Sequence, residues 1–362
     1  MTSIQPRWSV VLVLVGFCST GSQAAPADSL CPQPLSIAGA SCPDATLHTV
    51  KPPAIPRSTP FHISEKKLDA LPVPQQAPEL AKTLASLEHG SIEERVARLK
   101  AKAIKDLIFV KGGTFTMGDF TPLMKIPDVT RMTYNEDDKH LHDVTLSDFY
   151  LSRYKATYAE LNVFADATGR PRLAKDEEPK DRHPSVPAGM YWQTAQDFCQ
   201  WLGTITSHSF DLPTEAQWEY AARSRGQFFM IPTDDGHIDY GRNVPYAAQA
   251  ERLKRGGFNR RYPIGLFPPN PLGMYDMQYN GQEWVRDWYA ADTYERCTAQ
   301  DPKGPTAGAR KVVRGWAYGD SLKIGVSVWR RTYLPDGRIK ESPADETYFD
   351  VQMPSVRCVA TP

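Results

Sequence analysis

The 362-residue sequence lacks an excess of charge of either sign. Its 42 Lys and Arg residues balance 42 Asp and Glu residues, so the formal net charge is zero. Proteins that bind nucleic acid or anionic membranes do so largely through clustered positive charge. The composition therefore gives no electrostatic basis for a nucleic-acid partner.

Long apolar segments are also missing beyond the N-terminus. The run Val10–Phe17 is apolar but too short to span a bilayer. It follows Arg7 and precedes residues 22–24, whose Ser and Ala fit a signal-peptidase site. A buried strand is the alternative interpretation, and Cys18 raises that of a lipoprotein, although a lipobox requires a small residue where Phe17 stands. We predict a signal peptide over residues 1–24 and a periplasmic mature chain without a transmembrane segment.

Cysteine motifs for metal binding or redox chemistry are missing as well. The sequence contains no CxxC pair and no His/Cys cluster with zinc spacing. Its eight histidines form no recognisable nucleophile motif with Ser or Cys. Loss of Cys18 with the signal peptide would leave five cysteines, so at least one would be unpaired or would pair between chains. Cys31 and Cys42 are close enough in sequence to close a small loop.

Proline, by contrast, is abundant. The 31 prolines predict loop-rich structure, and residues 25–78 are expected to be extended because they are rich in Pro, Ser and Ala. A capping-box pattern at Ser91 and Glu94 then begins a helix with one apolar face. Packing on the main domain is the expected role of this helix, and partner binding is the alternative. We divide the mature chain into an N-terminal extension, residues 25–105, and a main domain, residues 108–362.

Short periodic segments fill the main domain. Ile108–Gly118 is typical of a hairpin around a glycine pair, and the alternation in His142–Leu151 predicts one strand. Helices are expected over Thr157–Thr168, Thr194–Leu202 and Thr214–Arg223, and further strands over Lys311–Val313 and Ser355–Val359. A few short helices and many short strands joined by long loops indicate the α+β class.

Several phrases of the main domain carry a family pattern in their order and spacing. They are Val110–Gly118, the strand that begins at His142, Leu212–Arg223, Asn270–Met277, Glu283-Trp284 and Val313–Gly315. Together they resemble the formylglycine-generating enzyme family over about residues 108–362. The resemblance implies a single irregular domain of C-type-lectin-like topology with little regular secondary structure.

The resemblance also implies where a copper site would lie. The family's oxidases bind copper through two cysteines, five positions apart, that follow an Arg-Gly-Gly-Ser motif. Here the two positions fall on Asp320 and Gly325, and Trp316 replaces the second glycine. Cu(I) prefers soft thiolate ligands, and neither residue supplies one. We therefore expect no bound copper and no formylglycine-generating activity.

Two cysteines match the family's structural pattern. In relatives, the positions of Cys199 and Cys358 are joined, which ties the C-terminal strand to a core helix. The resemblance therefore implies a disulfide between them, and two buried free thiols are the alternative.

Calcium is the cofactor that the resemblance implies. Relatives bind it through a phrase that here supplies the carboxylates of Asp276 and Glu283 and the backbone carbonyls of Tyr279 and Gly281. Hard cations prefer such oxygen ligands. Hydrogen bonding within a turn is the alternative role for the two carboxylates.

A second family calcium site would use Asn243, Val244 and Phe258. Its carboxylate position falls on Gly256, so this site is expected to be weakened or lost.

Residues that follow the lost cysteine motif are candidates for a binding groove. Trp316, Tyr318 and Trp329 would form an aromatic recognition surface, with Arg330 beside them. A salt-bridged strand face is the alternative, and the favoured one, for Arg330 and Arg331.

A scaffold that keeps its structural residues without its reactive cysteines predicts a binding or regulatory module in the cell envelope. Members of the family without the cysteines include the TagR-type proteins of type VI secretion. The expected partner is therefore an envelope protein: a kinase ectodomain, a secretion component or an effector that the chain neutralises. The alternative is an exported oxidoreductase of the PvdO-like type, although no acid–base pair or two-His-one-carboxylate spacing supports it.

Overall fold

The computed structural model describes residues 72–125, 130–133, 135–173, 182–245, 261–296, 298–315, 326–336 and 353–362. The predictions that fall outside these residues concern the signal peptide, Cys31, Cys42, Gly256, Phe258, Trp316, Tyr318, Asp320 and Gly325. Within the described ranges, no helix has the length and apolar character needed to cross a membrane.

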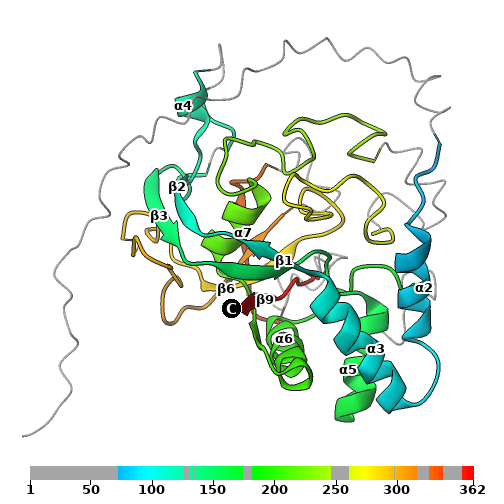
Figure 1. Cartoon of the computed structure of the whole chain (residues 1–362). Helices are drawn as coiled ribbons and strands as arrows, with labels where there is room; N and C mark the ends of the chain where they lie inside the picture. Colours follow the sequence, from blue (N-terminus) through cyan, green and yellow to red (C-terminus); the bar gives the residue numbers. More distant parts are fainter. Residues whose placement is uncertain are drawn as a thin grey trace, which may run out of the picture. The chain divides into compact units, whose positions relative to one another are not determined.

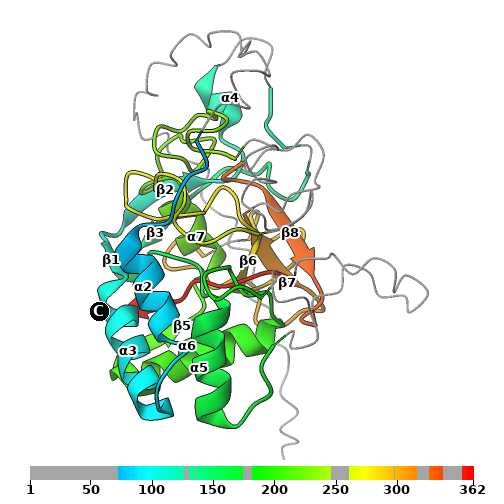
Figure 2. The same ribbon diagram turned by 90° about the vertical axis from the view of Figure 1, so that its right-hand side faces the viewer.

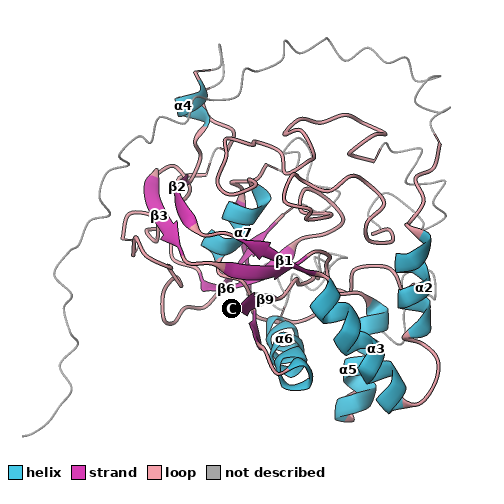
Figure 3. Cartoon of the chain, viewed as in Figure 1, coloured by secondary structure: helices cyan, strands magenta, loops and turns pink. Residues whose placement is uncertain are grey.

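The described chain consists of short helices and short strands that are joined by loops (Figure 3). In order they are α2 (Pro78–Ser86), α3 (Ile92–Lys105), β1 (Leu107–Val110), β2 (Gly113–Met117), α4 (Thr121–Met124), β3 (His142–Leu146), β4 (Phe149–Ser152), α5 (Tyr158–Thr168), α6 (Trp192–Thr206), β5 (Ser209–Asp211), α7 (Glu215–Ala222), β6 (Glu283–Trp288), β7 (Lys311–Arg314), β8 (Arg330–Tyr333) and β9 (Val359–Thr361). The predicted α+β class is confirmed.

Helices α2, α3, α5 and α6 pack together at one end of the domain (Figures 1 and 2). Helix α3 begins at the predicted capping box, in which the Ser91 hydroxyl accepts from the Glu94 amide and the Glu94 carboxylate accepts from the Ser91 amide. Its Leu99 is fully buried. The Lys102 ammonium lies 2.8 Å from Glu160 of α5. Helix α3 therefore packs on the main domain, as expected.

The glycine pair after β1 does not form the predicted hairpin. Strand β1 pairs with β4, and β2 pairs with β3, so the two halves of Ile108–Gly118 belong to different sheets. Gly112 lets the backbones cross closely, because a Cβ there would lie 2.2 Å from the Leu146 carbonyl oxygen. The Gly112 amide also donates to Asp148 at 2.9 Å. Close approach, rather than a tight turn, explains the glycine.

The single strand predicted over His142–Leu151 is two strands, β3 and β4. The break falls at Ser147 and Asp148. Asp301 stabilises it by accepting from the Ser147 amide at 2.8 Å and from the Ser147 hydroxyl at 2.6 Å. The chain thus leaves one sheet and enters the next without a long loop.

The C-terminal strand β9 lies inside the sheet whose order is β1-β4-β9-β5. Cys358, just before this strand, forms a disulfide with Cys199 of α6, and their Cα atoms are 5.5 Å apart. The disulfide that the family resemblance implied is confirmed. The strand predicted over Ser355–Val359 is wrong for most of its length, because β9 begins only at Val359 and Ser355 forms an isolated bridge with Glu283.

A separate three-stranded antiparallel sheet has the order β6-β7-β8. Glu283 of β6 faces Arg314 of β7, which in turn faces Arg330 of β8. Helix α7 packs against β6 and β7. Residues 316–325 come between β7 and β8 in the sequence. They include Asp320 and Gly325, the two positions at which the family resemblance implies cysteines.

Candidate functional site

Two glutamates of α7 form the centre of a buried ionic cluster. The helix begins at the capping box formed by Thr214 and Gln217, as the sequence predicts. Glu215 and Glu219 are one helical turn apart and so lie on the same face, and both are buried. A buried carboxylate is tolerated only when cations and hydrogen-bond donors compensate it.

Three arginines supply that compensation. Arg314 of β7 contacts Glu215 at 3.1 Å and Glu219 at 2.7 Å. Arg330 of β8 binds Glu215 with two nitrogens, at 2.9 and 2.8 Å, which is the bidentate geometry that suits guanidinium. Arg223 contacts Glu219 at 2.7 Å. We call these five residues the α7 cluster. It fixes both strands that flank residues 316–325.

A second ionic group is linked to the α7 cluster through Trp218. Arg357 binds Glu283 through Nε at 2.7 Å and through a terminal nitrogen at 3.0 Å. The Trp218 indole N–H also donates to Glu283 at 3.1 Å, while the Arg314 guanidinium lies 5.3 Å from a Trp218 ring centroid. Burial alone would raise the pKa of Glu283, but Arg357 and Lys155 hold it below its usual value. Trp218 therefore links the two charged groups.

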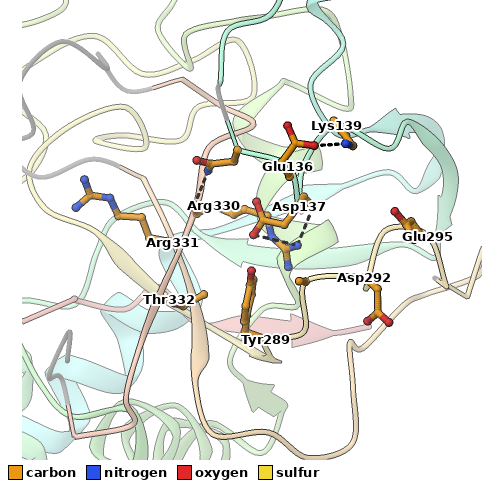
Figure 4. Close-up of a pocket in the computed structure, with 11 residues that line it drawn as sticks. Glu136, Asp137, Lys139, Tyr289, Asp292, Glu295, Arg330, Arg331 and Thr332 are labelled. Carbon is orange, nitrogen blue, oxygen red and sulfur yellow. Dashed lines mark hydrogen bonds and ion pairs between the residues drawn. The ribbon is translucent and has the colours of Figure 1, made fainter. Parts of the chain in front are cut away.

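A cavity of about 530 Å³, the β8 pocket, opens beside β8. It is lined by Asn135, Glu136, Asp137, Lys139, Tyr289, Ala291, Asp292, Glu295, Arg330, Arg331 and Thr332. Figure 4 shows the Tyr289 side chain pointing toward Asp137 and Arg330, with Asp292 and Glu295 on a loop to one side.

The β8 pocket has a negative lining. Four lining residues are acidic and three are basic. Two of them are paired with residues outside the lining, since Arg330 binds Glu215 and Asp292 lies 2.7 Å from Arg296. The Asp137 carboxylate lies 3.9 Å from Arg330, and Glu136 and Lys139 form an exposed ion pair. Acidic lining residues exceed basic ones by one, whether or not the paired Arg330 and Asp292 are counted, and this small excess favours a ligand that presents positive charge.

Of the predicted groove residues that the structure describes, Arg330 lines the β8 pocket and Trp329 does not. Arg330 lines the β8 pocket and belongs to a salt-bridged strand, which agrees with the favoured interpretation of this residue. Trp329 is only 7% exposed, and the Arg331 guanidinium lies 4.2 Å from its ring centroid. Trp329 therefore packs into the domain and offers little surface to a partner.

The predicted calcium residues are engaged within the protein. The Asn243 side-chain oxygen accepts from the Asp239 amide at 2.8 Å, and its amide group donates to Asp234 at 3.0 Å. At the other site, Lys155 binds the carbonyl oxygens of Tyr279 and Gly281. Burial lowers the pKa of Lys155 to about 8, so the ammonium form still predominates at neutral pH. Across the described ranges, no three His, Cys, Asp or Glu side chains gather in a way that could hold a metal.

Asp287 on β6 is expected to make the stability of the protein depend on pH. Burial, with repulsion from Glu215, raises the pKa of Asp287 to about 7. Because this lies above the unfolded value of about 3.9, the stabilising contribution is present below about pH 4 and is lost as the pH rises to about 7. Asp287→Asn should therefore be more stable than the wild type at pH 8, by about 4 kcal/mol, and should lose this advantage near pH 4.

Urea unfolding of both proteins across that pH range measures the effect. Asparagine keeps an oxygen that can accept from the Glu215 amide, which Asp287 binds at 2.9 Å, so the variant removes mainly the charge. A constant difference in unfolding free energy at every pH would contradict the assignment.

Sequence reasoning missed most of the cluster. Glu215 and Arg314 lie within two of the family phrases, but the sequence assigned no role to either residue. It assigned none to Lys155 either. The signal that could have found the pair was a Glu at both ends of one helical turn, because such a face needs buried cations.

Comparison with known proteins agrees with this geometry. A family model described as "Sulfatase-modifying factor enzyme 1-like domain" matches residues 93–341. The serine/threonine-protein kinase pkn1 of Chlamydia pneumoniae is 29% identical over 231 residues, which cover 61% of this chain and 34% of the kinase. The formylglycine-generating enzyme of Bos taurus is 25% identical over 260 residues, covering 59% of this chain and 65% of the enzyme. The chain thus spans about a third of one relative and just under two thirds of the other.

Among solved structures, PvdO from Pseudomonas aeruginosa superposes with a TM-score of 0.54 and 25% sequence identity. The match covers 71% of this chain and 94% of PvdO. The two phrases that meet in the α7 cluster, Leu212–Arg223 and Val313–Gly315, lie within the matched residues 93–341. Because the family model matches residues 93–341 and the sequence phrases agree with it, the chain belongs to the formylglycine-generating enzyme family, whose domain is the sulfatase-modifying factor enzyme 1-like domain.

Proposed function

We propose that this protein is an exported, non-catalytic member of its family that binds a partner protein in the cell envelope through the β8 pocket. The observation that carries the proposal is a selective loss. The family resemblance puts Asp320 and Gly325 at the two cysteine positions, while the α7 cluster joins the strands on either side of them to one helix. A scaffold kept rigid around a site without its thiolates fits binding better than oxidation.

The chemistry of the β8 pocket indicates the kind of partner. Its excess of one carboxylate favours a segment that carries Lys or Arg. Tyr289, whose ring centroid lies 5.2 Å from the Arg330 guanidinium, adds an aromatic ring to the same lining. The likeness to a serine/threonine-protein kinase supports a partner in a kinase pathway. We include type VI secretion in the proposal because TagR-type relatives act there. The predicted signal peptide and the Cys199–Cys358 disulfide support a periplasmic location.

Affinity capture from cross-linked cell envelopes tests the proposal. The mature protein should recover a kinase ectodomain or a secretion component in stoichiometric amount. Asp292→Lys combined with Glu295→Lys should weaken binding at least about tenfold, because two interface charges are reversed. Glu79→Lys combined with Glu93→Lys makes the same charge change on the exposed faces of α2 and α3, and it should bind normally.

Equal binding by both double variants would exclude the β8 pocket as the binding surface. The likeness to PvdO keeps an oxidoreductase as the second candidate. Oxygen uptake with a small-molecule or peptide substrate, together with no recovered partner, would favour that enzyme over the binding module.

A further inference from the structure

Lys155 is a fully buried lysine that has no part in the β8 pocket. It follows β4 and precedes α5, and its side chain is 0% exposed. An uncompensated ammonium in the interior costs several kcal/mol, so its neighbours must be acceptors or anions. The identity of those neighbours is the unusual feature.

The Lys155 ammonium is held by a loop rather than by another helix or strand. Its Nζ donates to the backbone oxygen of Tyr279 at 3.0 Å and to that of Gly281. It also lies 3.4 Å from Oε1 of Glu283. Two carbonyl dipoles and one carboxylate therefore converge on a single positive charge.

The backbone of this loop is shaped for that convergence. Asp276, Asn280 and Gly281 have positive φ angles of 60°, 69° and 97°. A Cβ at position 281 would lie 2.5 Å from Nε of Arg261, so only glycine fits. Such turns expose successive carbonyl oxygens to one point, which is how loops usually bind a cation.

These three groups are also three of the four calcium ligands that the family resemblance implies. The fourth, Asp276, accepts a hydrogen bond from the Gly265 amide at 2.8 Å, and burial raises its pKa. Calcium requires six to eight oxygens at about 2.3–2.6 Å. An ammonium already bonded to two of these oxygens leaves no room for the ion at the same point. The residues present do not fit calcium while Lys155 holds this position.

We propose that the Lys155 ammonium is a built-in replacement for the loop's metal ion. It donates hydrogen bonds to the same carbonyl oxygens and balances the charge of the same carboxylate. The folding of residues 276–283 is therefore independent of calcium. Because Glu283 begins β6 and also binds Arg357 and Trp218, the lysine stabilises the support of the α7 cluster whether or not calcium is present. The inference does not depend on the proposed partner binding.

Calcium titration of the mature protein is the first test. Calorimetry should detect no calcium binding in the Asn243→Ala variant, which excludes the second family site, and chelator should leave its melting temperature unchanged. Stoichiometric calcium in that variant, with a loss of thermal stability in chelator, would overturn the proposal.

Substitution of the lysine is the second test. Lys155→Met removes the charge but keeps the apolar stem, so it should lower the melting temperature by about 10 °C. Lys111→Met is the matched control, since Lys111 forms an exposed ion pair with Asp148, and it should change the melting temperature little. Equal stability of the two variants would overturn the proposal.

Lys155→Ala tests whether the oxygens are still a cation site. Shortening the side chain vacates the point between the carbonyls and Glu283, so this variant should gain calcium affinity and recover stability at millimolar calcium. A folded Lys155→Ala protein that gains no affinity would show that the loop is not a cation site, and the replacement would then be refuted.

Discussion

Arg314→Met is expected to lower the free energy of unfolding by about 3 kcal/mol, because it removes the cation that two buried carboxylates share and leaves each of them with one arginine. Arg314 is fully buried, and it also donates to the carbonyl oxygens of Ser327 and Val328 at 2.8 and 3.2 Å. Those two bonds hold the residues that lead into β8. Denaturant unfolding monitored by tryptophan fluorescence measures the loss.

Two further variants separate charge from geometry. Arg314→Lys keeps the positive charge but cannot form the same planar set of bonds to Glu215 and Glu219, so it should fall between Met and the wild type. Arg170→Met removes the cationic half of an exposed pair with Asp197, and it should cost about 1 kcal/mol or less. If Arg314→Met were no more destabilising than Arg170→Met, the α7 cluster would not be what fixes β7 and β8.

Loss of the Cys199–Cys358 disulfide should produce the other large effect. The bond closes a loop with a sequence separation of 159 residues. The chain-entropy model assigns a loop of that length about 4–5 kcal/mol, as an upper figure. The double substitution Cys199→Ala and Cys358→Ala should therefore shift the urea midpoint markedly downward.

Reducing agent gives the control for this prediction. Both cysteines are buried, at 0% and 2% exposure, so reduction requires unfolding and should take effect only in denaturant. Under those conditions the wild type should become as unstable as the double variant, whereas the double variant should not respond. Identical midpoints for the oxidised and reduced wild type would contradict the stabilising role of the bond.

Local signals located α3, α5, α6 and α7 but not α2 or α4, and they were insufficient for the sheets. The capping boxes at Ser91 and Thr214 lie within one turn of chain, and both helices begin there. The pairing of β1 with β4 instead of β2 depends on how Gly112 approaches Leu146, far away in sequence. Glycine pairs serve tight turns and close crossings alike, so the sequence pattern could not choose between them.

The candidate site shows the same division. The family phrases placed Glu215 and Arg314 in the right elements, and the resemblance implied the correct disulfide. Lys155 could not be assigned, because its partners come from a loop more than 120 residues away. An isolated lysine before a helix looks like a surface residue until the fold brings carbonyl oxygens around it.

The shared use of Glu215 by Arg314 and Arg330 has a practical consequence. These arginines are direct neighbours across β7 and β8, and both bind one carboxylate, so the two ends of the intervening segment are fastened at one point. The separation of the two strand ends is therefore set by one carboxylate, and a change at Glu215 should release β7 and β8 together.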